Sequence, residues 1–306
     1  MNINEKKINY LLIDGTAYLY RAYYTFPTLK NNLNKPCGAI FGVINMVKKI
    51  LLKYPYTKII IAFDSPQKTF RNKIFLPYKK NRNKMPIKLK QQIMPLFYTI
   101  KNIGIPIISI PTFEADDIIG TLAKKLYTQN KSILISTYDK DFAQLVNSHI
   151  NILVGTSDII LDETKVKQKY GVIPKLIPDL LGLSGDSSDN IPGVPKIGKK
   201  TALYLIKNFG SLNKIYENIE KISKYPIRNS KLIHKQLKNY KNLALLSKKL
   251  ATIKTNISKK LIIIDKLTML PPSIKKLSYI FKYYNFQRLL KLLEKGIWLK
   301  SIKNIQ

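Results

Sequence analysis

Residues 105–126 read IPIISIPTFEADDIIGTLAKKL. The first six form an apolar run rich in β-branched residues, which predicts a buried strand over Ile105–Ile110. From Ala115 to Leu126 apolar residues recur three and four positions apart, which predicts a helix with one apolar face. Three acids follow the strand or open the helix: Glu114, Asp116 and Asp117. The stretch therefore predicts a strand followed by a helix, with carboxylates where the strand ends.

The same alternation of strand and helix runs through the first half of the chain. Further apolar runs predict strands at Tyr10–Ile13, Ile59–Phe63, Ile133–Ile135 and Asn151–Val154. Helical spacing predicts helices at Thr16–Tyr24, Ala39–Leu52 and Ile93–Ile103. Buried strands that alternate with helices indicate an α/β fold, with a mostly parallel sheet flanked by helices.

The character of the sequence changes near Gly171. Helical spacing returns at Lys175–Leu183 and Lys199–Asn208, on either side of a segment rich in Gly, Pro, Ser and Asp. The remainder is Lys-rich and also has helical apolar spacing. We expect two regions: an α/β domain over residues 1–170 and a helical region over residues 171–306.

The composition excludes several classes of protein. Apolar residues make up 45% of the 306 residues, too many for a disordered chain. No apolar run approaches the roughly 18 residues of a membrane span, and Met1–Asn9 lacks the features of a secretory signal. Cys37 is the single cysteine, which excludes an intramolecular disulfide and a Cys-rich metal site. We therefore expect a cytoplasmic protein without a membrane partner.

The charge balance is the unusual feature. The chain has 53 Lys and Arg against 18 Asp and Glu, for a net charge of +35. A surface of this kind binds polyanions strongly at moderate salt, so nucleic acid is the expected partner. Only five of the basic residues are Arg, and an excess of Lys, Ile and Asn is also what an AT-rich coding sequence gives. Charge thus indicates a class of partner but not a reaction.

Half of the acids fall in five short places, four of which follow predicted strands. These acids are Asp14, Asp64, Glu114, Asp116, Asp117, Asp139, Asp141, Asp186 and Asp189. The carboxyl ends of parallel strands meet at one edge of a sheet, where α/β proteins bind ligands. Two carboxylates about 4 Å apart repel by about 4 kcal/mol at an effective dielectric of about 20, so such a group needs cations. Oxygen ligands favour Mg²⁺ or Mn²⁺, and this many acids suggest two ions, an arrangement suited to in-line phosphoryl displacement.

Each acid taken alone also has a structural explanation. A single Asp after a strand commonly caps the N-terminus of a helix. Acids in a first helical turn, such as Asp116 and Asp117, interact favourably with the helix dipole. Their concentration at strand ends, in a chain this poor in acids, favours the metal site.

Residues 65–113 contain no acid but ten Lys and Arg, from Lys68 to Lys101. Three aromatic residues, Phe70, Phe75 and Tyr78, lie among the first of these. Basic groups can follow phosphates while aromatic rings stack on bases, which suits single-stranded nucleic acid. A solvated Lys-rich loop explains the same composition, and composition does not separate the two interpretations.

Residues 191–202 read IPGVPKIGKKTA and lie between two predicted helices. Gly193 and Gly198 permit a tight turn with exposed backbone N–H groups, and Lys199 and Lys200 follow directly. Such groups at a helix N-terminus can hold a phosphate without reading the base sequence. This favours a helix–hairpin–helix that binds the duplex backbone over an ordinary helix–turn–helix connector.

Taken in order, the acidic segments resemble the flap-endonuclease family, and most closely the bacterial 5′→3′ exonuclease domain of DNA polymerase I. The resemblance spans Leu11 to about Leu299. The segments that carry it are Leu-Ile-Asp14-Gly-Thr, Ala-Phe-Asp64, Phe-Glu114-Ala-Asp-Asp117, Ser-Thr-Tyr-Asp139-Lys-Asp141 and Gly-Asp186-Ser-Ser-Asp189-Asn-Ile-Pro-Gly-Val. It implies a PIN-like fold with a helical arch over the site, at about residues 66–98, and a helix–hairpin–helix region after it.

The resemblance also implies a metal-dependent phosphodiesterase that uses two Mg²⁺ ions, for which Mn²⁺ can substitute. Asp14, Asp64, Glu114 and Asp116 would lie nearer the first ion, with Asp117 beside them, and Asp139, Asp141, Asp186 and Asp189 nearer the second. The implied phosphate and strand contacts are Arg71, Lys79 and Arg82 in the arch, Arg21 near the site and Lys200 at the hairpin. The hairpin carbonyls resemble a K⁺ site of the family.

The implied substrates are DNA with a 5′ flap, nick or gap and RNA primer–DNA hybrids, in replication and repair. A DNA polymerase and a ligase would act in the same pathway, and we expect a monomer. Two features depart from the family. Tyr138 stands where close relatives usually have Gly, and the chain stops at residue 306 without a polymerase region, like a stand-alone form.

Two other functions remain open at this point. A non-catalytic protein that binds branched DNA would keep the metals for shape, and Tyr138 beside Asp139 is its best support. An RNA-processing PIN nuclease would explain the acids but not the hairpin. A preference for single-stranded RNA, with no requirement for a duplex, would favour the RNA-processing nuclease.

Overall fold

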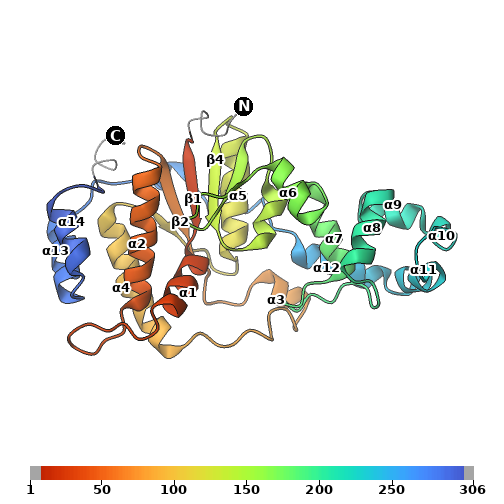
Figure 1. Cartoon of the computed structure of the whole chain (residues 1–306), viewed down its shortest axis with the longest axis horizontal. Coiled ribbons are helices and arrows are strands. Elements are labelled where there is room, and N and C mark those ends of the chain that lie inside the picture. Colours follow the sequence, from red (N-terminus) through yellow and green to blue (C-terminus); the bar gives the residue numbers. More distant parts are fainter. Residues whose placement is uncertain (1–7, 300–306) are drawn as a thin grey trace.

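The computed structural model describes residues 8–299 and contains one six-stranded sheet (Figure 1). The strands lie in the order β3 (Ile107–Ile108), β2 (Lys58–Ala62), β1 (Tyr10–Asp14), β4 (Ile133–Thr137), β5 (Ile150–Val154) and β6 (Ile160–Leu161). All neighbours are parallel except β5 and β6. In the centre of the sheet Leu12 lies between Ile60 and Ile135. The α/β fold with a mostly parallel sheet is confirmed.

The central strands are almost wholly apolar because both faces of the sheet are covered. Leu11 and Ile13 of β1 face a core shared with α1, α2 and α4, whereas Leu12 between them faces a core shared with α5. The helices of this half are α1 (Gly15–Thr25), α2 (Gly38–Lys53), α3 (Phe70–Ile74), α4 (Ile87–Ile103), α5 (Ala115–Tyr127) and α6 (Glu163–Tyr170), with the 3-10 helix η2 (Lys140–Leu145). The alternation along β1 therefore builds two hydrophobic cores from one strand.

Helices form the second half of the chain, and none in the described residues is long and apolar enough to cross a membrane. They are η3 (Pro174–Leu176), α7 (Ile177–Ser184), α8 (Lys199–Phe209), α9 (Leu212–Glu217), α10 (Ile219–Ile222), α11 (Ser230–Asn239), α12 (Lys241–Ala251), η4 (Ile264–Lys266), α13 (Ile274–Tyr283) and α14 (Gln287–Glu294). Helices α8 to α11 extend away from the sheet at the right of Figure 1, and α12 returns toward it.

The last two helices lie at the opposite end of the molecule from α8 to α11 (Figure 1). Leu277 and Phe281 of α13 and Leu289 of α14 belong to the same core as α2 and α4. Trp298 lies in that core and is 1% exposed. The region expected over residues 171–306 therefore contributes to both ends of the structure rather than forming one separate body.

The structure differs from the expected elements in three places. The strand expected over Ile105–Ile110 shortens to β3, because Pro106 and Pro111 have no N–H to give to a strand ladder. The antiparallel β6 and the helix α6 were not predicted. The arch is helical only at its two ends, α3 and α4, and residues 75–86 between them are mostly turns. Pro77, Pro86 and the left-handed backbone of Lys79, with φ of 54°, explain why that segment is not a helix.

Candidate active site

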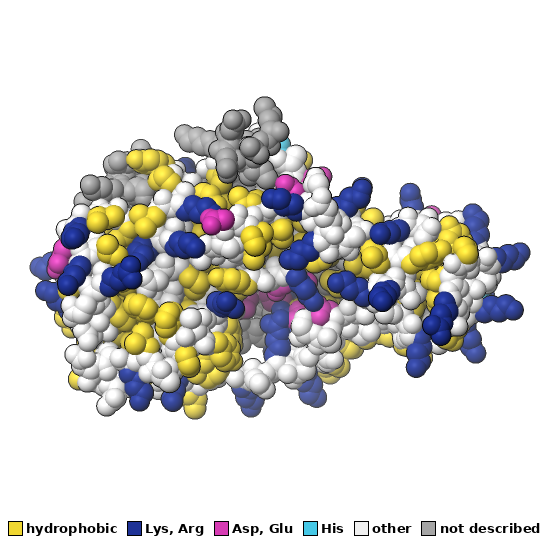
Figure 2. Space-filling model, viewed as in Figure 1, with side chains coloured by type: hydrophobic (Ala, Val, Ile, Leu, Met, Phe, Trp, Pro, Cys, Tyr) yellow, Lys and Arg dark blue, Asp and Glu magenta, His cyan; other side chains and the backbone are white. Residues whose placement is uncertain are grey.

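Four groups of acids lie at the carboxyl ends of the strands, as expected. Asp14 is the last residue of β1, Asp64 lies two residues after β2, and Asp139 lies two residues after β4. Glu114 is the N-cap of α5 and Asp186 lies two residues after α7. In Figure 2 acidic side chains gather in a hollow near the middle of the face, with Lys and Arg side chains around them. The chain folds so that the strand ends and the N-terminus of α5 bring acids to one edge of the sheet, where the loop after α7 adds Asp186.

The pKa values show that several of these carboxyls are crowded. Burial is the main reason that the pKa of Asp14 rises from 3.8 to about 7, and the charge of Asp64 raises it further. Hydrogen bonds to Asp14 from the Ala17 N–H and from Thr137 Oγ1 lower this pKa but do not cancel the rise. Burial and the charge of Asp139 raise the pKa of Asp141 to about 7 as well. Burial and the Asp139 charge also raise the pKa of Asp116 well above its ordinary value. A site in which carboxylates repel one another in this way attracts cations.

Three basic side chains hold the acids in the structure. The Lys79 ammonium donates to Glu114 at 2.9 Å, and Arg82 donates to Asp189. The Lys140 ammonium lies 2.7 Å from Asp186. Burial alone would raise the pKa of Asp186, but the Lys140 contact and hydrogen bonds from Ser188 lower it. The sequence predicted Lys79 and Arg82, but it gave no role to Lys140, although this lysine stands between Asp139 and Asp141.

Arg71 and Asp117 do not lie open in the site as predicted. Arg71 donates to both carboxylate oxygens of Asp117, at 2.7 and 2.8 Å, and to the carbonyls of Leu250 and Thr252, each at 2.9 Å. Arg71 is 2% exposed and Asp117 is fully buried. The predicted substrate contact of Arg71 and the metal-ligand role of Asp117 are therefore corrected to a buried ion pair, which joins α3 to α5 and to the C-terminal end of α12.

Tyr78 is also buried rather than available for stacking on a base. It is 4% exposed, and its hydroxyl donates to Glu114 at 3.2 Å or to Asp189 at 3.3 Å. The backbone N–H of Lys79 donates to the Asp189 carbonyl at 2.9 Å, and the Asn190 amide donates to the Pro77 carbonyl at 2.7 Å. These contacts fix the turns of the arch against the loop that follows α7, above the acids.

The two glycines of the hairpin differ in exposure: Gly198 is exposed to solvent and Gly193 is buried. The Gly193 N–H is buried and donates to Ser247 Oγ at 3.0 Å, so the predicted phosphate contact at Gly193 is wrong. Gly198 is the N-cap of α8 and has no side chain to cap the helix, and it is exposed together with Lys199 and Lys200. Nothing lies within 4 Å of the position a Gly198 Cβ would take. That Gly198, Lys199 and Lys200 hold a phosphate stays a prediction.

The donor set fits a hard divalent cation, although the oxygens are not gathered for one. Within residues 8–299, no three acidic, histidine or cysteine side chains come together as a metal-binding group. The acids are instead held apart in pairs with Lys79, Arg82 and Lys140. Asp186 Oδ2 is buried without a hydrogen bond of good geometry, because Lys140 approaches it only as an ion pair. Buried carboxylate oxygens with raised pKa values are donors that suit Mg²⁺ or Mn²⁺.

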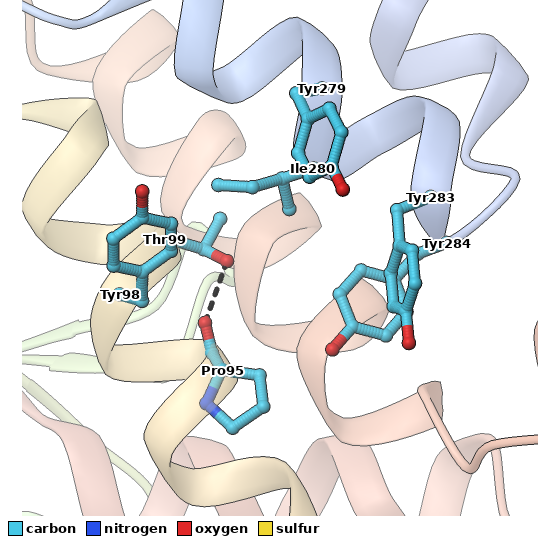
Figure 3. Close-up of a pocket in the computed structure, with 7 residues that line it drawn as sticks. All are labelled: Pro95, Tyr98, Thr99, Tyr279, Ile280, Tyr283 and Tyr284. Carbon is cyan, nitrogen blue, oxygen red and sulfur yellow. Dashed lines mark hydrogen bonds between the residues drawn. The ribbon is translucent and has the colours of Figure 1, made fainter.

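A second hollow lies between α4 and α13. Its volume is about 270 Å³, and Figure 3 shows the rings of Tyr98 and Tyr279 on its two sides. Tyr283 and Tyr284 line the same hollow, whose walls carry no acid. It lacks the polar donors of the acidic site, so the chemistry is assigned to the strand ends.

The metal-free protein is expected to lose stability as the pH rises from about 4 to about 7. The pKa of Asp14 is 3.8 in an ordinary setting and about 7 here, so between these values the folded state holds a proton that the unfolded state releases. Each increase in pH therefore favours unfolding, by up to about 4 kcal/mol for one group shifted by about three units. The lowered pKa of Asp186 acts below 3.8, outside this window. Urea unfolding in EDTA, followed by the fluorescence of the single Trp298, measures the change, and a flat or rising stability would contradict it.

Comparison with known proteins agrees with this geometry. The family profile of the 5′-3′ exonuclease N-terminal resolvase-like domain matches residues 9–171, and that of the 5′-3′ exonuclease C-terminal SAM fold matches residues 172–274. A 5′-3′ exonuclease of Buchnera aphidicola subsp. Baizongia pistaciae is 64% identical over 303 residues, 99% of this chain and 100% of that protein. DNA polymerase I of Pseudomonas aeruginosa is 40% identical over 90% of this chain and 30% of its own length.

Solved structures share the fold. The 5′-exonuclease of phage T5, with zinc ions bound, superposes with a TM-score of 0.64 at 19% identity, over 97% of this chain and 99% of that one. The catalytic core of Rad2 in complex with a DNA substrate superposes with a TM-score of 0.61 at 14% identity, over 95% and 94%. The sequence matches extend over nearly the whole chain, and the acids that they span are those gathered at the strand ends. The chain belongs to the 5′-3′ exonuclease family.

Proposed function

We propose that this chain is a structure-specific 5′ nuclease that hydrolyses phosphodiesters at 5′ flaps, nicks and gaps of DNA and in RNA primers. The observation that carries the proposal is the group of acids at the strand ends, covered by the turns of residues 75–86. These acids lie where α/β proteins bind ligands, and basic side chains already meet them there. Membership of the 5′-3′ exonuclease family supports the same reaction.

Divalent metal ions are the cofactor that this donor set fits, and the T5 relative was crystallised with them. We propose two Mg²⁺ ions, one near Asp14, Asp64, Glu114 and Asp116 and one near Asp139, Asp141, Asp186 and Asp189. When bound, such ions lower the pKa of a coordinated water and stabilise charge on the phosphate and the leaving oxygen. In the structure the acids are paired with Lys79, Arg82 and Lys140. Once metal ions bind the acids, Lys79 and Arg82 would be free to contact the scissile phosphate.

The proposed DNA contacts lie on both sides of the acids. Gly198, Lys199 and Lys200 at the start of α8 would hold a phosphate of the duplex. The arch, through Lys79 and Arg82, would hold the strand to be cut. Structures of T5 flap endonuclease and of Rad2 include DNA, which supports DNA as the substrate. A K⁺ ion at the hairpin, a monomeric state and a shared pathway with a polymerase and a ligase are part of this proposal.

Binding of branched DNA without cleavage is the alternative, and Tyr138 was its support. A bulky residue before Asp139 was expected to shift the backbone next to the acids. In the structure β4 continues to Thr137, whose Oγ1 accepts the Asp139 N–H at 3.0 Å. The ring of Tyr138 instead lies over Gly155, which has no side chain to oppose it. The absence of a distortion next to Asp139 favours the nuclease.

Cleavage of a 3′-labelled flap duplex with Mg²⁺ and with EDTA tests the proposal. We expect cutting near the flap junction that requires Mg²⁺ and is lost in Asp186→Ala, because the variant removes a buried carboxylate of the acid group. Mn²⁺ should restore cutting to the EDTA-treated protein. Tight binding of the flap without cutting in either metal would reject the nuclease and leave the branched-DNA-binding protein.

A further inference from the structure

Tyr138 connects three elements beside the site. Its ring centroid lies 5.9 Å from that of Tyr18 on α1, and its hydroxyl lies 3.8 Å from the sulfur of Met46 on α2. The guanidinium carbon of Arg21, also on α1, lies 5.3 Å from the centroid of the same ring. Tyr138 directly precedes Asp139 in the chain, so one residue contacts α1, α2 and the acid-bearing turn.

Gly155 makes this position of the ring possible. A Cβ on Gly155 would lie 2.1 Å from the Tyr138 ring, closer than any side chain can approach. Gly155 is fixed in place, because its N–H donates to the Thr137 carbonyl at 2.8 Å and its carbonyl accepts from Tyr18. Its φ of +58° is in the left-handed region, which also favours glycine. The two residues therefore form a matched pair, in which the glycine provides the space that the ring fills.

Arg21 has no other side-chain partner within residues 8–299. No carboxylate or carbonyl accepts from its guanidinium, which is exposed and always charged. A long side chain of this kind samples many rotamers unless something holds it. The face of the Tyr138 ring is the contact that does so here, by a cation–π interaction. Arg21 and Asp14 are joined by the same helix, since Asp14 caps α1, so the held guanidinium keeps a fixed relation to the acids.

We propose that Tyr138 is a positioning residue that holds the Arg21 guanidinium ready to bind a phosphate of the substrate strand. The ring reduces the rotamer freedom of Arg21 before the nucleic acid arrives, and the N–H groups at the edge of the guanidinium stay free to donate to the phosphate. Gly155 is equally necessary for this arrangement, because any side chain at position 155 would displace the Tyr138 ring. The inference rests on the proposed function for its substrate, DNA with a 5′ flap.

Equilibrium binding of a flap duplex in Ca²⁺, measured by fluorescence anisotropy, is the first test. Tyr138→Leu removes the ring face but keeps an apolar side chain, and it should weaken binding about threefold to tenfold. Tyr138→Phe keeps the ring and should bind like the unchanged protein. In an Arg21→Ala background, Tyr138→Leu should have no further effect, because the residue it positions is gone. An equal loss with and without Arg21, or no loss at all, would overturn the proposal.

Gly155→Ala tests the same proposal by displacing the Tyr138 ring without changing Tyr138 itself. The added Cβ should push the ring off Arg21 and give the loss seen for Tyr138→Leu, and the same change in a Tyr138→Leu background should add little. Urea unfolding of each variant shows whether the protein remains folded. In Mg²⁺ the loss should appear in KM while kcat changes less than about twofold, as expected for lost binding alone. If the unchanged protein binds flaps but does not cut them, the proposed function fails while the binding test of Tyr138 still stands.

Discussion

Asp116→Asn is expected to abolish cleavage and, at the same time, to make the metal-free protein more stable. Asp116 lies in the first turn of α5, and burial and the charge of Asp139 raise its pKa against the opposing charge of Lys79. Its ionised form therefore destabilises the folded state above its ordinary pKa, and the neutral amide removes that cost. The unfolding free energy in EDTA should rise near pH 8 and should not change near pH 2, where the carboxyl is protonated in both the folded and the unfolded state.

The cleavage activity of Asp116→Asn should fall, although its stability rises. Loss of a carboxylate that we propose as a metal ligand should lower Mg²⁺-dependent flap cleavage by more than about a hundredfold, the usual upper cost of losing an outer contact to such a site. Asp158→Asn is the matched control, since the Asp158 side chain is 90% exposed and its ion pair is with Lys53 on the surface. It should change neither cleavage nor stability by a measurable amount. A stable, fully active Asp116→Asn protein, or an inactive one that is less stable near pH 8, would contradict this account of the site.

The strands and the acids at their ends were predictable because their signals are local. Ile59–Phe63 is apolar throughout because β2 is buried on both faces, and Asp64 follows it directly in the sequence. Parallel strands share one edge for their carboxyl ends, so topology alone places Asp14, Asp64 and Asp139 together. The helix N-terminus at Gly198 was equally local, since the glycine and the lysines after it are adjacent in the chain.

The partners of the acids were not predictable, because each comes from a distant part of the chain. Arg71 and Asp117 are 46 residues apart, and no periodicity or composition signals that they pair. Tyr78 reads as an exposed aromatic residue within a basic segment, yet its hydroxyl reaches Asp189, 111 residues away. The fit of Tyr138 over Gly155 is a matter of three-dimensional packing. The sequence therefore indicated which acids lie at the strand ends, but not which Lys and Arg side chains pair with them.

Arg71→Ala is expected to lower the free energy of unfolding by about 3–5 kcal/mol, the cost of removing one partner from a buried ion pair. The change leaves the Asp117 carboxylate fully buried without its guanidinium, and it removes the donors to the Leu250 and Thr252 carbonyls. Urea unfolding at constant pH measures the loss. Arg82→Ala is the matched control from the same arch, because half of the Arg82 side chain is exposed, and it should cost at most about 1 kcal/mol.

Replacing both charges separates a structural Arg71 from a catalytic one. Arg71→Met combined with Asp117→Leu removes the pair without leaving a lone buried charge, and it should recover much of the stability lost in Arg71→Ala. If Arg71 acts only by joining α3 to α5, the double variant should also recover most of the flap cleavage, because the arch returns to its place over the acids. If Arg71 binds the scissile phosphate itself, cleavage should stay low in the double variant even though it is stable. Arg82→Ala should instead weaken cleavage of a protein that remains nearly as stable as the original, since the Arg82 side chain is half exposed and its guanidinium contacts Asp189.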